Sequence, residues 1–420
     1  MLTGPNETAA ALDELSASDI DHLLILQVTF TDAATSVAVA NALTCPVSIW
    51  AVPEPRLGGR LRLNAFCGLN LASHALGLHG RSFSWIYADG GALVPGQLEK
   101  LFNDKPKWGE EPEPTAGEVD EITGQAVVSA LAGRRIGRIG HHPEGFDTCA
   151  YDADNLKALT GVSVEAMSLD DLFSTAKAQN PVSLEQLRAE ANQSVEGLAD
   201  VNPHELDQSL RLKLALDDIR TNKSFDAFAI RCWPETFTEY GGAVCGPVSM
   251  MGEARVPCAC EADVYGAVTQ MILQEAAQQP VFLADLVDMD VADNTGVVWH
   301  CGQAPRSMCA AENTPSATIH TNRRMPLLLE FALKPGRVTL VRLSQAKGAT
   351  KLILSAGEML DRPMAFTGTS GVIRFDRPAG DVLSDVIGTG LEHHMALAYG
   401  DHRPALRGVA RALDIPVLEI

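Results

Sequence analysis

The chain has 420 residues and a hydrophobic content of 46%, which is enough for two or three domains with a sizeable core. Its formal net charge of −20 argues against a nucleic-acid partner, because phosphate backbones are bound by clusters of lysine and arginine. The absence of a long apolar run and of a signal peptide, together with nine scattered cysteines, predicts a cytoplasmic protein with no membrane partner.

Strands and helices are predicted to alternate through the first 133 residues. Apolar segments at 22–30, 47–53 and 83–88 read as buried strands, and helices are expected at about 33–43 and 68–79 between them. This order is typical of a parallel, doubly wound sheet. We therefore expect an N-terminal α/β domain over residues 1–133.

A second round of the same pattern begins at residue 134. Strands are predicted at 134–140, 225–232 and 256–260, and Asn202 followed by Pro203 predicts the start of a long helix. The apolar segments 280–289 and 295–301 are expected to continue this sheet. A second doubly wound α/β domain is therefore expected over residues 134–304.

The predicted pattern of elements changes after about residue 305. Apolar segments joined by short turns with glycine or proline indicate antiparallel strands, followed by a strand at 395–400 and a helix at 404–413. The fold class expected for the whole chain is two parallel-sheet α/β domains followed by a C-terminal β-rich α+β domain, residues 305–420.

Carboxylates follow two consecutive strands of the second domain. Glu235 comes after one strand, and Glu261 and Asp263 come after the next. Ligands of open α/β sheets bind beyond the carboxyl ends of the strands, and a buried carboxylate is costly without a partner. These side chains could cap the following helices or hold a divalent cation. His393 and His394 enter a later strand, where alternation would direct only one of them toward such a site.

Five segments, in chain order, carry a resemblance to a known family. "FAIRCWPE", "PCACEADVYGA", "VVWHCG", "GRVTLVRLS" and "HHMALAYGD" together resemble the L-fucose/L-arabinose isomerase family. The resemblance implies two α/β domains, a β-rich C-terminal domain and interconversion of aldoses and ketoses. It also implies a divalent cation, commonly Mn²⁺, with Mg²⁺ or Co²⁺ as alternatives.

The resemblance assigns residues to the expected metal site. Glu235 corresponds to the first acidic ligand, which also acts as an acid or base, and His394 corresponds to the metal-binding histidine. The middle ligand stays open between Glu261 and Asp263, because alignment on Gly266 favours the first and alignment on the acidic pair favours the second. All three carboxylates are candidates for proton transfer.

Further candidates concern the sugar and the assembly. The resemblance implies a homo-oligomer, trimer-based, in which one subunit covers the pocket of another through an arginine-rich loop and helix at 56–76. The candidate sugar-binding residues are Arg62, Asn64, His142, Glu144, His300 and His393.

The chemistry of an aldose–ketose isomerase explains these residue types. A proton moves between C1 and C2 through a cis-ene-diol, which requires an acid or base beside a cation that stabilises the developing oxyanion. A sugar-binding or regulatory protein on the same scaffold is the main alternative. A metal-dependent epimerase or lyase would use the same ene-diol.

Overall fold

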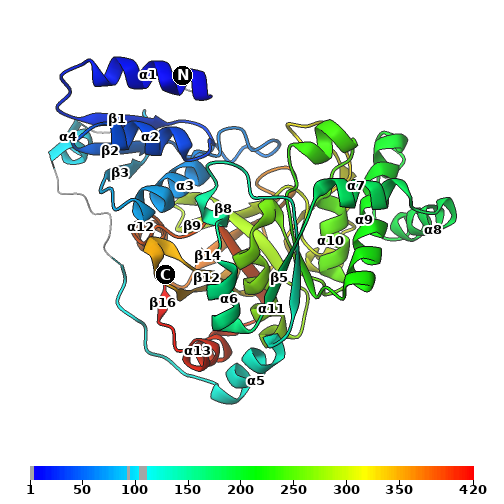
Figure 1. Ribbon diagram of the computed structural model, residues 1–420. Coiled ribbons are helices and arrows are strands. Elements are labelled where there is room, and N and C mark those ends of the chain that lie inside the picture. Colours follow the sequence, from blue (N-terminus) through cyan, green and yellow to red (C-terminus); the bar gives the residue numbers. More distant parts are fainter. Residues whose placement is uncertain (1–3, 92–94, 104–110) are drawn as a thin grey trace.

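The protein, seen in a computed structural model that describes residues 4–91, 95–103 and 111–420, is built around three β-sheets (Figure 1). The N-terminal part, in blue, lies at the top of the view, and the second parallel sheet with its green helices lies to the right. A large mixed sheet lies between and below them. The fold class is therefore as expected: two parallel-sheet α/β units and a β-rich unit.

The N-terminal sheet contains three parallel strands in the order β1-β2-β3. Its strands are β1 (Leu23–Gln27), β2 (Val47–Ala51) and β3 (Ser84–Tyr87). Its helices are α1 (Pro5–Ser16), α2 (Ala34–Ala42), α3 (Ala65–Leu78) and α4 (Pro95–Asn103). The strands and helices predicted between residues 22 and 88 are confirmed.

Helix α3 connects this unit to the rest of the molecule. Its residues from Ala65 to Gly77 are all buried, and it contacts both the N-terminal sheet and the large mixed sheet. Polar side chains of α3 donate to backbone carbonyls just before His393: Ser73 to Ile387 at 2.6 Å and Asn70 to Leu391. The segment that leads into the histidine pair is therefore held by a buried helix.

The second parallel sheet has the order β5-β4-β6-β7. Its strands are β4 (Arg135–Ile139), β5 (Ser163–Met167), β6 (Ala227–Ile230) and β7 (Cys258–Ala259). Its helices are α5 (Glu121–Leu131), α6 (Ala153–Thr160), α7 (Leu169–Lys177), α8 (Pro181–Asn192), α9 (Pro203–Lys223), α10 (Cys245–Glu253) and α11 (Val264–Ala277). Asn202 caps α9, as its position before Pro203 predicts, by accepting hydrogen bonds from the backbone N–H groups of His204 and Glu205.

The mixed sheet contains nine strands, of which β14, β9, β8, β15, β12 and β13 close into an antiparallel barrel because β13 also pairs with β14. The barrel strands are β8 (Phe282–Asp290), β9 (Thr295–His300), β12 (Gly336–Ser344), β13 (Lys351–Met359), β14 (Thr369–Phe375) and β15 (His394–Tyr399). The outer strands are β10 (Ser316–Thr318), β11 (Leu328–Ala332) and β16 (Val417–Glu419), and the helices are α12 (Ala379–Thr389) and α13 (Arg403–Ala412).

Strands β8 and β9 correct one expectation. The prediction that residues 280–301 continue the second parallel sheet is wrong, because β8 pairs with β15 and β9 pairs with β14, both antiparallel. The barrel therefore begins upstream of residue 304, where a domain boundary was expected. The reason is that β8 is buried along almost its whole length, so its apolar run looks like that of a parallel core strand.

Short 3₁₀ or π turns link several of these elements, at Asp147–Cys149, Thr236–Tyr240, Cys260–Ala262, Arg306–Met308 and Ala346–Gly348. The turn after β7 delivers its side chains toward the barrel strands β8 and β15. Among the described helices, none combines the length and the apolar character needed to cross a lipid bilayer.

Helices α5 and α13 cross at a pair of glycines, which gives a test of the packing. A Cβ on Gly124 would lie 2.1 Å from the carbonyl carbon of Gly408, so Gly124→Ala must push the helices apart. We expect a loss of about 1–3 kcal/mol in the free energy of unfolding, measured by urea denaturation. Ala126→Ser, on the exposed face of α5, is the control and should change stability by less than about 0.5 kcal/mol. Equal stability of the two variants would show that the helices do not cross this closely.

Candidate metal and sugar site

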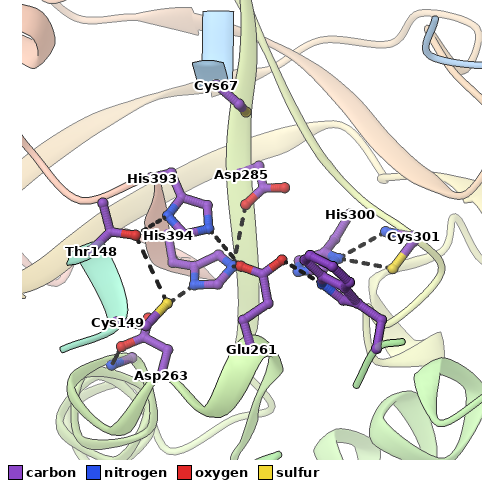
Figure 2. Close-up of polar contacts among 12 residues, drawn as sticks. Cys67, Thr148, Cys149, Glu261, Asp263, Asp285, His300, Cys301, His393 and His394 are labelled. Atoms are coloured by element: carbon purple, nitrogen blue, oxygen red, sulfur yellow. Dashed lines mark hydrogen bonds and ion pairs between the residues drawn. The ribbon is translucent and has the colours of Figure 1, made fainter. Parts of the chain in front are cut away.

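Glu261 lies at the centre of a polar cluster between the second parallel sheet and the barrel (Figure 2). It follows β7 in a 3₁₀ turn with a left-handed backbone, φ 57°, which is uncommon for a residue with a side chain. Its carboxylate is held by Trp233, whose Nε1 donates to Oε1 at 3.1 Å, and by His393, whose Nε2 lies 2.9 Å from Oε2. Burial alone would raise the pKa of Glu261, but the contacts with His393 and His394 outweigh it and lower the pKa.

Both histidines of the adjacent pair face Glu261. The ring centroids of His393 and His394 are 3.9 Å apart, and Nε2 of His394 lies 3.8 Å from Oε2 of Glu261. The expectation that only one of the pair faces the site is therefore corrected. Alternation applies within a strand, whereas His393 lies just before β15 and His394 is its first residue.

Asp263 lies behind His394 and orients it. Its carboxylate is paired with Arg342 at 2.6 Å, accepts a hydrogen bond from the N–H of Gly266 at the start of α11, and lies 2.9 Å from Nδ1 of His394. Burial alone would raise the pKa of Asp263, but Arg342 and His394 hold it well below its usual range. Asp263 is thus occupied as the partner of a histidine, an arrangement common behind metal-binding imidazoles.

The remaining nitrogen of His394 faces Asp285 on β8. Asp285 lies opposite His394 in the strand register, and its Oδ1 is 3.4 Å from Nε2 of His394. Both atoms are buried, and neither has a hydrogen-bond partner among the residues that the structure describes. Burial raises the pKa of Asp285 to about 6. Burial and the adjacent His393 lower the pKa of His394, so its imidazole is neutral at pH 7.

These atoms fit a divalent cation. Buried polar atoms are costly without a partner, and Nε2 of His394 lies 3.4 Å from Oδ1 of Asp285 and 3.8 Å from Oε2 of Glu261. Carboxylate oxygens with one imidazole suit Mn²⁺, Mg²⁺ or Co²⁺. Cys149 also lies beside the cluster, but burial raises its pKa well above the usual range, so its thiol stays protonated and is a poor ligand.

His300, at the end of β9, completes this side of the cluster. Its ring stacks with that of His394, with centroids 5.6 Å apart, and it belongs to a group with Asp285 and His394 whose ligand atoms lie within 4.8 Å of one another. The backbone N–H of Cys301 donates to Nδ1 of His300 at 2.9 Å. Burial alone would lower the pKa of His300, but Cys301 and Asp285 raise it to about 10, so Nε2 carries a proton and is a hydrogen-bond donor.

A cavity of about 730 Å³ opens above the cluster. Glu261, Asp285, His300 and His393 form part of its wall, and helix α1 and the segment after β1 supply the opposite side. Of the sugar-binding candidates, the residues that line this cavity are Asn64, Glu144, His300 and His393.

Glu235 lies elsewhere, contrary to the expectation for the first metal ligand. Its carboxylate is paired with Arg231 at 2.7 Å, and both residues line a different surface depression, beside His141. The π turn Thr236–Tyr240 begins directly after Glu235, and it is Trp233, two residues earlier, that reaches Glu261. The strand end therefore delivers an indole to the cluster in place of a carboxylate.

Arg62 and His142 are also not among the described residues of the cavity wall. Arg62 is exposed, and its backbone N–H donates to Glu54, whose carboxylate also binds the N–H groups of Leu63 and Asn64. His142 is partly buried, and burial lowers its pKa. The loop before α3 is thus hydrogen-bonded to Glu54 of the same chain, and Asn64 lines the cavity of that chain.

Three residues that contribute to the cluster were not foreseen from the sequence. Asp285 is the most important, and its only signal is an acidic residue inside the apolar run "VFLADLVDM". Trp233 holds Glu261, and Thr148 holds His393 through a contact of 2.9 Å between Oγ1 and Nδ1. Thr148 belongs to the loop after β4, in which His142 and Glu144 were the candidates.

Comparison with known proteins identifies relatives along the whole chain. Residues 1–91 match the N-terminal domain of the fucose/sulfoquinovose isomerases, and residues 298–420 match the L-fucose isomerase C-terminal domain. The sulfoquinovose isomerase of Alkalicoccus urumqiensis is 30% identical over 424 residues, which cover 100% of this chain and 90% of that protein. The sulfoquinovose isomerase of Priestia megaterium is 30% identical over 99% of this chain and 89% of its own length. That of Clostridium sp. (strain MSTE9) is 31% identical over 94% and 85%.

The buried pair behind His394 gives a stability test. Arg342→Met leaves the charge of Asp263 buried without its main partner, so we expect a loss of about 3–5 kcal/mol in the free energy of unfolding. Arg337→Met, on the same strand β12, breaks a half-exposed pair with Asp376 and should cost about 1 kcal/mol or less. Denaturant unfolding of both variants measures the difference. Equal losses would contradict the central role of the Arg342–Asp263 pair.

Proposed function

The chain belongs to the fucose isomerase family, and from this premise we propose that it interconverts the aldose and ketose forms of sulfoquinovose, 6-deoxy-6-sulfoglucose. Sugar isomerisation itself is the activity that the family and the relatives have in common. A sulfonated substrate is the finer part of the proposal, and the names of the three relatives support it.

The observation that carries the metal site is that Oδ1 of Asp285 and Nε2 of His394 lack a hydrogen-bond partner among the described residues, with Oε2 of Glu261 3.8 Å from that nitrogen. We assign these three residues as the ligands. A bound divalent cation supplies Lewis-acid polarisation of the sugar carbonyl and the neighbouring hydroxyl. Mn²⁺ is the proposed ion, with Mg²⁺ or Co²⁺ as alternatives of similar ligand preference.

Proton transfer is the task of the two carboxylates. Glu261 is held by Trp233 and His393, whereas Oδ1 of Asp285 has no hydrogen-bond partner in the described part of the chain, so the two carboxylates differ in how firmly they are held and in pKa. One carboxylate removes the proton from C2 of the aldose and returns it to C1, through a cis-ene-diol, while the other takes the hydroxyl proton from O2 and gives a proton to O1. Nε2 of His300 donates to an oxygen of the reacting carbons. The buried position of the cluster excludes water, which strengthens these contacts.

The expected trimer-based homo-oligomer and the cytoplasmic location remain part of this proposal. Asn64 lines the cavity of its own chain, and the loop that carries it is bonded to Glu54 of the same chain. A second subunit would therefore cover the mouth of the cavity without supplying Asn64. This differs from a composite site built from Arg62 and Asn64 of a neighbour.

Substitution of the carboxylates tests the assignment of the acid or base. Glu261→Gln and Asp285→Asn keep the shape of the side chains and remove the group that transfers the proton, so we expect kcat to fall about 10²-fold or more. NMR should show loss of sugar-dependent deuterium exchange at C2 in both variants. Glu235→Gln is the control and should keep nearly normal activity and exchange. An inactive Glu235→Gln with an active Asp285→Asn would return the role to Glu235.

Removal of the ligand histidine tests the metal site independently of activity. Wild-type protein purified without chelator should contain one divalent cation per chain, and dialysis against a chelator should lower its Tm, because a ligand that binds only the folded state stabilises it. His394→Ala should contain little metal and show no chelator-dependent change in Tm. His204→Ala, an exposed histidine on α9, should behave as the wild type. Equal metal content in the two variants would remove His394 from the ligand set.

A further inference from the structure

Among the aspartate, glutamate, lysine and arginine side chains that line the cavity, carboxylates outnumber cations. The carboxylates that line it include Asp32, Glu144, Glu261 and Asp285, whereas Arg323 is the one lysine or arginine among the described residues of the wall. A sulfonate stays negatively charged across the pH range in which proteins are folded. An anionic substituent in this cavity therefore needs a cation, and Arg323 supplies a permanently charged one.

Arg323 is available for such a contact. In the part of the chain that the structure describes, it forms no ion pair with a carboxylate, although the protein carries a formal net charge of −20. Its side chain is exposed at the mouth of the cavity. A guanidinium presents several N–H donors in a rigid fork, which suits an oxyanion with more than one acceptor oxygen.

The loop that carries Arg323 is preorganised. It joins β10 to β11, and Nδ1 of His320 accepts the backbone N–H groups of Asn322 and Arg323, both at 3.2 Å. The backbone of His320 bonds to that of Met325 at 2.9 Å, and its ring packs edge-on against Phe237 at a centroid distance of 5.2 Å. Less ordering is therefore needed when an anion binds.

Trp233 connects Arg323 to the reacting end of the cavity. The Arg323 guanidinium carbon lies 5.5 Å from the centroid of the Trp233 ring, and Nε1 of the same indole donates to Glu261 at 3.1 Å. One indole ring thus separates the cation from the carboxylate that faces C1 and C2. A hexose has its reacting carbons at one end and its C6 substituent at the other, and Trp233 has Glu261 at its Nε1 edge and Arg323 over its ring face.

We propose that Arg323 binds the anionic C6 substituent of the sugar, a sulfonate, and determines the preference for a charged over an uncharged hexose. The inference rests on the proposed function for the identity of the sugar. Arg323 contacts the substrate at the end remote from the chemistry, and Trp233 holds both the guanidinium and Glu261 at a fixed separation. Loss of the guanidinium weakens binding of the charged sugar and leaves the isomerisation of an uncharged one intact.

The test compares two sugars and two arginines. Arg323→Gln should lower kcat/KM for sulfoquinovose by about 10- to 100-fold, mainly through KM, as expected for the loss of a charge-assisted hydrogen bond. Its kcat/KM for 6-deoxyglucose, which has no charge at C6, should stay within about twofold of the wild type because no contact to C1 or C2 is changed. Arg324→Gln is the control, since Arg324 is also exposed but is not among the described residues of the cavity wall. It should match the wild type on both sugars.

The possible outcomes separate this inference from the proposed function. Unchanged kcat/KM for sulfoquinovose in Arg323→Gln, or an equal loss on both sugars, would overturn the role of Arg323 and leave the proposed function standing. A wild type that does not convert sulfoquinovose would overturn the proposed function. In that case calorimetric titration with sulfoquinovose itself decides on Arg323. A larger Kd in Arg323→Gln than in the wild type, with no change in Arg324→Gln, supports the inference. The same Kd in Arg323→Gln and the wild type, or no binding to the wild type, overturns it.

Discussion

The buried contact between Arg342, Asp263 and His394 is the interaction on which the rest of the site depends. A carboxylate and a guanidinium that are both fully buried would be costly apart, but Arg342 donates to both oxygens of Asp263, and Oδ2 of Asp263 also binds Nδ1 of His394. This contact selects the ring nitrogen that carries the proton and turns the other toward Glu261 and Asp285. Because Arg342 lies on β12 and Asp263 caps α11, the contact also joins the barrel to the second parallel sheet.

The barrel explains why two distant segments meet at this point. Antiparallel pairing of β8 with β15 puts Asp285 opposite His394, while α3 holds the chain just before β15 through Ser73 and Asn70. The left-handed turn after β7 then brings Glu261 to the same place. Two of the three proposed ligands therefore lie on barrel strands, Asp285 on β8 and His394 on β15, and the third lies in the turn after β7. The loop between β10 and β11, which carries Arg323, is the more variable type of segment on which substrate preference is usually built.

The sequence predicts the elements and part of the site well, for identifiable reasons. Glu261 and His394 stand at strand ends within recognisable segments, and the structure brings both to the cluster. Asp263 instead contacts Nδ1 of His394, the ring nitrogen that does not face Glu261 and Asp285. Asp285 could not be found because its partner is set by strand register across more than a hundred residues. Glu235 looked equivalent to Glu261, but the direction of the turn after β6 depends on packing that no local pattern reveals. The same ambiguity of a fully buried strand caused β8 and β9 to be assigned to the wrong sheet.

The proposed metal site holds one divalent cation between Glu261, Asp285 and His394. Diffraction from crystals grown with Mn²⁺, measured at the absorption edge of manganese, locates the ion directly. We expect one anomalous peak at the cavity, within bonding distance of Oε2 of Glu261, Oδ1 of Asp285 and Nε2 of His394. A peak beside Glu235 and Arg231, or a cavity without any manganese, would contradict it.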